Sequence, residues 1–135
     1  MKLFRIALYA ALLLASSISF AQTKPGDLVA DVPFPFVVSG RTLPPGHYIL
    51  NSLTDVVRLY DHENKSVFVA THNAERPLHE NSSKMVFHRY GDNYFLAEVW
   101  VAGNSIGKAL VPSRAEREIR DGGAELEIAV VRLGK

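Results

Sequence analysis

Four side chains that could hold a metal ion surround one polar segment, residues 73–83. They are His72, His79, Glu80 and His88. Imidazole and carboxylate groups are ligands that Zn²⁺ and other transition metals accept. No pair among them has the tight spacing of a zinc motif such as H-E-x-x-H. A metal site formed by convergence of the four is therefore one hypothesis, and independent surface histidines are the alternative.

The same segment carries groups that a small hydrolase could use. Ser82 and Ser83 lie close in sequence to His79, and hydrolysis by a side-chain nucleophile requires a base beside it. No G-x-S-x-G motif occurs, and the scattered carboxylates give no pair with assignable acid and base roles. A small hydrolase is therefore the third functional alternative, after a binding domain and a metal-binding protein.

The run from Gly103 to Ala109 resembles a phosphate-binding loop but departs from it twice. A P-loop has a spacing of four residues between its glycines and a serine or threonine after the lysine. Here three residues separate Gly103 from Gly107, and Ala109 follows Lys108. We therefore expect no nucleotide site and interpret the run as a connection between a strand and a helix.

The densest group of aromatic residues lies between Phe87 and Trp100. Tyr90, Tyr94 and Trp100 combine an apolar ring with a polar atom, and His88 stands among them in the sequence. Side chains of this kind are enriched at binding surfaces. We expect these four side chains to share one face of a hairpin and to form a partly covered ligand-binding platform, with its exposed edge near Tyr90 and Tyr94 at the turn. The alternative is that the helix or a loop covers them.

This expectation depends on a predicted hairpin with the loop Gly91-Asp92-Asn93. Such a loop sets the register of the two strands and gives one apolar face, which we assign to the core. Its opposed pairs are Met85–Val99, Phe87–Ala97 and Arg89–Phe95. A slip of one residue would mix apolar and polar side chains on both faces, so the clean separation favours this register.

The elements that position these residues are short strands. Apolar residues recur with a period of two between turn residues, which is typical of antiparallel strands. Pro33 and Pro35 lie in the first strand and indicate a sheet edge, because proline cannot donate to a neighbouring strand. The expected strands are 29–38, 46–53, 55–60, 66–72, 84–90, 94–101 and 125–133. In the last of them Leu126, Ile128 and Val130 alternate.

One helix is predicted near the C-terminus. Ser113 and Glu116 match the S-x-x-E capping box, and Gly122-Gly123 supplies a stop. Ala115 and Ile119 are its apolar stripe, so we expect a short solvated helix lying on the sheet. The fold class is therefore mainly β: an antiparallel sandwich or partly closed barrel of six to seven strands with one short helix near the C-terminus.

The N-terminal residues are typical of a signal peptide. Lys2 and Arg5 precede an apolar stretch at residues 6–15, and small residues lead up to Ala21. The apolar stretch is shorter than the roughly 20 residues of a membrane span. We therefore expect a signal peptide at residues 1–21 and export to the periplasm or the extracellular space.

The remaining chain, residues 22–135, has the length of a single β-rich domain. It contains no cysteine, which excludes disulfides, so a packed core must stabilise the fold. Of the 15 lysines and arginines, two belong to the signal peptide, which leaves 13 against 14 acidic side chains and a formal charge of −1. This balance does not favour a nucleic-acid partner.

Several motifs together resemble an uncharacterised family of small exported bacterial proteins. They are "VPFPF", "LPPGHYIL", "FHRYGDNYFLAEVW" and "SRAERE", and the resemblance extends to about Arg120. It implies export and a shared fold, and it brings no catalytic residues. We therefore expect an exported non-catalytic domain that binds a glycan, a peptide or an envelope protein, or has a structural envelope role. No cofactor is expected.

Overall fold

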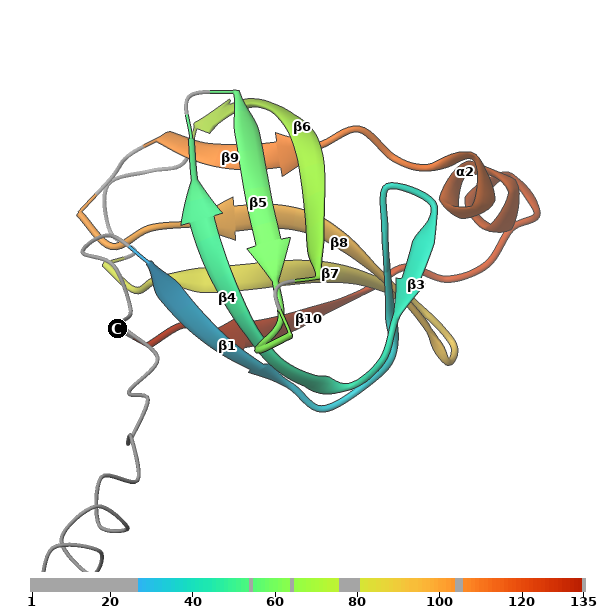
Figure 1. Cartoon of the computed structure of the whole chain (residues 1–135). Coiled ribbons are helices and arrows are strands. Elements are labelled where there is room, and N and C mark those ends of the chain that lie inside the picture. Colours follow the sequence, from blue (N-terminus) through green and yellow to red (C-terminus); the bar gives the residue numbers. More distant parts are fainter. Residues whose placement is uncertain (1–26, 54, 64, 76–80, 104–105, 135) are drawn as a thin grey trace, which may run out of the picture.

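The structure, a computed structural model, describes residues 27–53, 55–63, 65–75, 81–103 and 106–134 (Figure 1). The predicted signal peptide lies outside these residues. Ten strands and one helix are present in this part of the chain. The strands are β1 (Leu28–Val32), β2 (Phe36–Val38), β3 (Arg41–Leu43), β4 (Gly46–Ser52), β5 (Val56–Tyr60), β6 (Ser66–Glu75), β7 (Lys84–Tyr90), β8 (Asn93–Trp100), β9 (Ile106–Leu110) and β10 (Glu127–Arg132), and the helix is α2 (Arg114–Asp121).

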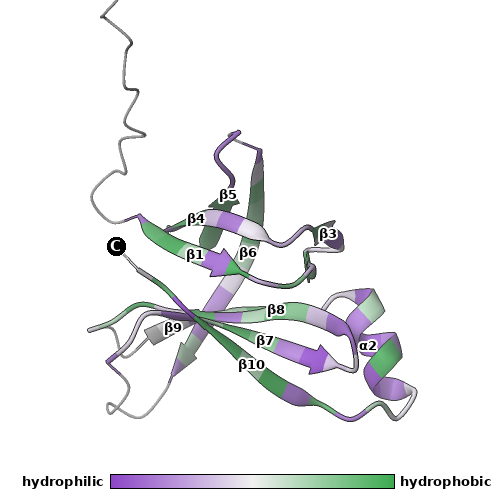
Figure 2. Cartoon of the chain, turned by 90° about the horizontal axis from the view of Figure 1, so that it is seen from below, coloured by the Kyte–Doolittle hydropathy of each residue, from purple (hydrophilic) through white to green (hydrophobic). Residues whose placement is uncertain are grey.

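The mainly antiparallel β fold is confirmed, and its strands form two layers (Figure 2). One layer has the order β1-β4-β5-β6, and the other contains β9, β8, β7 and β10, with β2 and β3 beside β8. The long strand β6 belongs to both, because residues 66–70 pair with β5 and residues 71–75 pair with β9. Val29 of β1 forms an isolated bridge with Gly134, which follows β10, and the sheet does not close into a barrel. None of the described helices is long and apolar enough to span a bilayer.

The core lies between the two layers and is centred on aromatic rings. Phe87 of β7 is fully buried, and its ring meets Phe34 at 5.1 Å and Phe36 at 5.4 Å between centroids, both edge to face. Edge-to-face contact is a favoured geometry for aromatic pairs. Leu50 and Leu59 contribute from the facing layer and are each 1% exposed.

The prediction of one continuous strand at residues 29–38 is wrong, because this segment forms two strands. The segment Pro33–Pro35 separates β1, which pairs with β4, from β2, which pairs with β3 and β8. Prolines lack the N–H that a continuous ladder needs, so the chain leaves one sheet there and enters the other. Strand β1 ends the strand order, but Pro33 and Pro35 follow it and belong to no strand, so they do not mark an edge strand as predicted.

Two further strands were not expected from the sequence. Strand β3 follows a two-residue turn in which Ser39 and Gly40 have φ angles of 51° and 77°. Strand β9 occupies the run that we interpreted as a connection, and its Gly107 is buried. The dipeptide Ser-Gly is a turn signal between the short runs on either side of it, and a glycine within a strand often marks close approach of another group.

The register of the β7–β8 hairpin is right in its outer half and wrong near the turn. Lys84, Met85 and Val86 pair as predicted, but a bulge after Val86 places Phe87 opposite Leu96. The loop is only Gly91-Asp92, with a φ of 62° at Gly91, as expected for a two-residue hairpin turn with glycine first. The bulge absorbs the resulting shift of one residue, so the sequence pattern and the tight turn are both satisfied.

The bulge exchanges faces close to the turn. Tyr94 lies on the core side, where its ring stacks on Phe34 at 3.8 Å. Phe95, which we assigned to the core face, is buried on the opposite side of the sheet, where its ring meets Tyr90 at 6.0 Å. The assignment of Phe95 as a buried residue is therefore correct, but the surface that buries it is not the one predicted.

The closing strand β10 pairs with β7 and turns its regular apolar stripe outward. Leu126, Ile128 and Val130 are 46%, 57% and 50% exposed. The other face of the strand contacts the core through Ala129 and Val131, which pair with Phe87 and Met85. The alternation of apolar residues thus marked a strand correctly without indicating which side of it faces the core.

Candidate functional site

Helix α2 contacts the sheet through a buried carboxylate. Glu116 is 3% exposed, and its Oε1 lies 2.5 Å from Nδ1 of His88 on β7. The same oxygen accepts a hydrogen bond from the hydroxyl of Tyr90 at 3.2 Å. Burial, followed by the charge of Glu116 and this hydrogen bond, raises the pKa of Tyr90. An ionised carboxylate only accepts hydrogen bonds, so with Glu116 ionised the donor in this contact is Nδ1 of His88.

The cap of α2 forms as predicted in one half only. Ser113 Oγ accepts a hydrogen bond from the backbone N–H of Glu116 at 3.2 Å, as in a capping box. The carboxylate of Glu116 is instead bonded to His88 and Tyr90. Ala115 is exposed and Ile119 half-buried, so the predicted apolar stripe is not what seats the helix on the sheet.

The four residues of the predicted platform do not form one open surface. Tyr90 and Trp100 are 3% and 5% exposed, and the side chain of His88 is 27% exposed beside Glu116. Tyr94 lies on the opposite face of the hairpin, in contact with Phe34. The structure therefore brings His88 and Tyr90 together around Glu116 and supports the alternative in which the helix covers part of this face. A ligand-binding role for the four residues stays a prediction.

The indole of Trp100 packs on the neighbouring strand β9. Its Nε1 donates to Glu98 Oε2 at 2.7 Å, and its ring lies directly over Gly107 of β9. A Cβ atom added at Gly107 would come within 2.7 Å of three ring atoms. The glycine that the sequence places in this run is therefore explained by packing, without any phosphate ligand.

The histidines of the metal hypothesis are only partly described. His79 and Glu80 lie outside the described residues, His72 is exposed on β6, and His88 is engaged by Glu116. Two strands, β9 and β8, separate the strand of His72 from that of His88. In the part of the chain that the structure describes, no three histidine or acidic side chains converge as metal ligands. The metal hypothesis therefore stays a prediction that depends on residues 76–80.

Ser83, one of the two serines of the hydrolase hypothesis, is engaged in hydrogen bonds that hold the fold together. Ser83 is half-buried, its Oγ accepts the N–H of Ala102 at 2.9 Å, and its carbonyl accepts the N–H of Leu133 at 2.9 Å. These bonds tie the start of β7 to two neighbouring segments. Ser83 thus has a structural role, and the hydrolase alternative gains no support from it.

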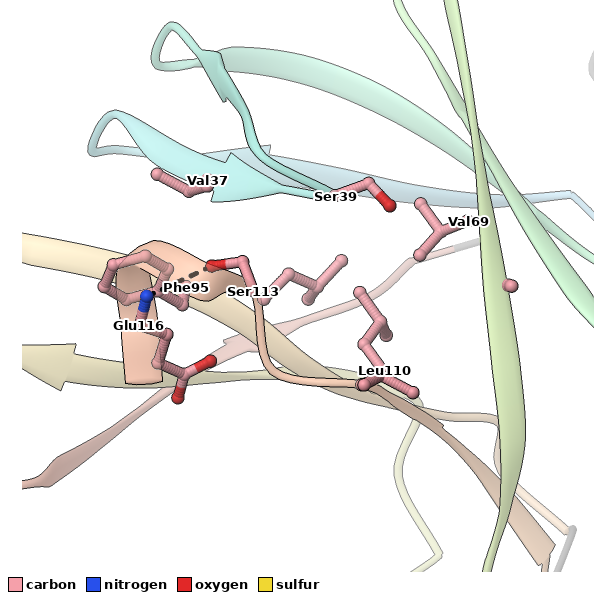
Figure 3. A pocket seen from close by; sticks show the side chains of 10 residues that line it. Val37, Ser39, Val69, Phe95, Leu110, Ser113 and Glu116 are labelled. Atoms are coloured by element: carbon pink, nitrogen blue, oxygen red, sulfur yellow. Dashed lines mark hydrogen bonds between the residues drawn. The ribbon is translucent and has the colours of Figure 1, made fainter. Parts of the chain in front are cut away.

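A small pocket lies beside the N-terminus of α2 (Figure 3). Val37 and Ser39 border it on one side, and Phe95, Ser113 and Glu116 border it on the other. Its volume is about 140 Å³. Pockets for small molecules measure roughly 300–1,000 Å³, so this one is too small for more than a fragment of a ligand.

A larger cleft of about 690 Å³ opens where β3 lies beside the turn between β5 and β6. Its apolar lining consists of Leu43, Pro44, Tyr48, Leu59 and Val67. Its polar lining consists of Arg41, Thr42, Asp61, Lys65 and Ser66. Sequence reasoning missed this site because it missed β3. The turn signal at Ser39-Gly40 could have indicated the hairpin, but not its position against β5 and β6.

Comparison of the chain with protein-family models, with curated proteins and with solved structures gave no match. The cleft beside β3 and the Glu116 contact are therefore the features from which a function can be inferred.

Proposed function

We propose that the chain is an exported, non-catalytic binding domain and that the cleft beside β3 is its ligand site. The observation that carries the proposal is the volume of the cleft, about 690 Å³, combined with its lining. Pockets for small molecules have volumes of roughly 300–1,000 Å³ and join apolar walls to a few polar groups. The pocket beside α2, at about 140 Å³, is too small for such a ligand.

The polar groups of the cleft are engaged in bonds that support binding rather than catalysis. The hydroxyl of Tyr48 donates to the carbonyl of Pro44 at 2.5 Å. The hydroxyl of Ser66 accepts hydrogen bonds from Arg58 at 2.9 and 3.1 Å. A catalytic hydroxyl needs a base that takes its proton, whereas here Tyr48 donates to a backbone carbonyl and Ser66 accepts from a guanidinium.

Export is the second part of the proposal, and the N-terminal sequence supports it. Mass spectrometry of the exported protein should find Gln22 as the first residue, located in the periplasm or outside the cell. A product that retains Met1 would contradict this part of the proposal without affecting the cleft.

Thermal-shift screening of the mature protein against glycans, peptidoglycan fragments and peptides tests the binding role. A ligand at about 100 times its dissociation constant stabilises a protein by roughly 2.7 kcal/mol, which such a screen detects. Thr42→Trp should fill the cleft and abolish the shift. Ser52→Trp, an exposed position on β4 that does not line the cleft, is the matched control.

The thermal shifts of the two variants show whether the ligand binds in the cleft. A shift that survives in Ser52→Trp and disappears in Thr42→Trp supports the cleft as the site. An equal shift in both variants would move the binding site elsewhere on the molecule. No shift with any ligand class would favour the structural envelope role instead.

A further inference from the structure

We infer that the cleft takes an amphipathic anion, an aliphatic chain that ends in a carboxylate, with Arg41 as the residue that binds the carboxylate. The inference rests on the proposed binding function and specifies the ligand class for the same cleft.

The inner part of the cleft is apolar. Leu59 and Tyr48, at 1% and 5% exposure, are its most deeply buried residues, and Leu43 and Val67 are half-buried beside them. The hydroxyl of Tyr48 donates to the carbonyl of Pro44, and its ring packs edge to face on Phe36 of the core at 5.3 Å between centroids. The half-buried Leu43 and Val67 therefore supply more of the apolar surface that a ligand can reach. Removal of apolar ligand surface from water is favourable in proportion to its area, so an aliphatic chain suits this part.

The position of Arg41 at the cleft follows from the hairpin turn. Ser39 and Gly40 both have positive φ, and the turn pairs Val38 with Arg41, the first residue of β3. Two-residue turns with both φ values positive match the twist of the strands they join, so Arg41 is held on a regular element. Its side chain makes no hydrogen bond or ion pair with any other described residue.

The other two charged residues of the cleft, Lys65 and Asp61, have contacts within the segment between β5 and β6. Lys65 Nζ lies 2.7 Å from Glu63 Oε2. Asp61 Oδ1 accepts the N–H groups of Glu63 and Lys65 at 2.9 and 3.0 Å, which fixes the carboxylate within the turn. Among the described residues that line the cleft, Arg41 is the charged residue that makes no hydrogen bond or ion pair, and its guanidinium suits a carboxylate because its N–H groups match both oxygens.

The experiment compares decanoate, decanol and decyltrimethylammonium by titration calorimetry on the mature protein, below their micelle concentrations and at constant ionic strength. The three probes share an aliphatic chain and differ in the charge of the head group. We expect decanoate to bind about tenfold more tightly than decanol, as a charged hydrogen-bonded pair provides. Decyltrimethylammonium should bind most weakly of the three.

Two substitutions of Arg41 link the difference to this residue. Arg41→Gln should remove the roughly tenfold advantage of decanoate and leave decanol binding unchanged, while Arg41→Lys should retain part of the advantage. Arg117→Gln removes an exposed arginine of α2 and is the matched control for total charge. Unchanged melting temperatures verify that each variant is folded.

The results distinguish this inference from the proposed function. If decanol binds as tightly as decanoate and Arg41→Gln changes neither, the cleft is a binding site but the anion inference is wrong. If no probe binds to the mature protein, and none binds to a folded Arg41→Gln variant, the inference is also wrong. In that case the glycan and peptide screen with Thr42→Trp decides separately whether the cleft binds at all.

Discussion

Glu116 of α2 and His88 of β7 are joined at 2.5 Å between Oε1 and Nδ1, and this contact attaches the helix to the sheet. The hydroxyl of Tyr90 donates to the same carboxylate oxygen. The helix has little apolar surface of its own facing the sheet, since Glu116 is its one buried residue. A polar contact therefore replaces the apolar stripe that usually seats an amphipathic helix.

Glu116→Ala should lower the free energy of unfolding by about 1.5–3 kcal/mol, the range for hydrogen bonds to charged groups. The substitution leaves His88 and Tyr90 without their shared acceptor. Glu118→Ala is the control, because Glu118 pairs with Arg114 at 2.8 Å on the exposed side of the same helix. An exposed pair of this spacing contributes about 0.3–0.5 kcal/mol. Equal losses in urea melts of the two variants would contradict the structural role of Glu116.

Gly107→Ala should destabilise the fold by about 1–3 kcal/mol through overpacking against the indole of Trp100. Gly134→Ala is the matched control, since a Cβ atom there meets nothing within 4 Å. Trp100 is the only tryptophan of the chain, so its fluorescence also reports displacement of the ring. In the background of Trp100→Leu the cost of Gly107→Ala should shrink, and a double-mutant cycle measures the coupling. Additive costs would mean that the ring does not oppose the new methyl group.

Stability should decrease in alkaline solution, and Tyr90→Phe should reduce that decrease. The folded state raises the pKa of Tyr90 above its ordinary value of 10.0 through burial and Glu116. A raised pKa means that the folded state holds the proton more tightly than the unfolded state. The stabilisation is therefore complete below the unfolded pKa and is lost as pH rises through the folded pKa. Urea midpoints measured across this window test the prediction.

Part of the alkaline effect should persist in Tyr90→Phe. Burial also raises the pKa of Tyr60, with a further contribution from its hydrogen bond to Asp27, and burial raises that of Tyr48. An identical pH dependence in Tyr90→Phe and the unmodified protein would mean that burial and Glu116 do not raise the pKa of Tyr90 in solution.

Phe87→Ala should cost about 3–5 kcal/mol, because it removes the ring at the centre of the core and leaves a cavity. Phe68→Ala provides the comparison with the same chemical change on the surface, since Phe68 is 61% exposed on β6. Surface substitutions usually change stability by about 0.5 kcal/mol or less. Guanidinium melts of the two variants measure the difference, and similar costs would show that the core is not centred on Phe87.

The features that sequence alone predicted are those with local causes. The cap at Ser113 depends on residues three positions apart, and the outer half of the β7–β8 hairpin follows from alternation along each strand. Alternation also identified the closing strand. These signals arise from backbone geometry and from side chains close in sequence, so they can be read without knowledge of the partners.

The features that needed the tertiary structure depend on contacts between distant segments. The tight turn and the alternation of apolar residues require registers that differ by one residue, and the bulge after Val86 accommodates both. No local signal in the sequence indicates where this bulge forms. The outward side of β10 is decided by its pairing with β7, and the burial of Glu116 by the position of His88. The cleft exists only because β3 lies beside the β5–β6 turn. In each case the stabilising free energy comes from burial or hydrogen bonding between segments that are distant in sequence. The periodicity of a single segment does not encode such contacts.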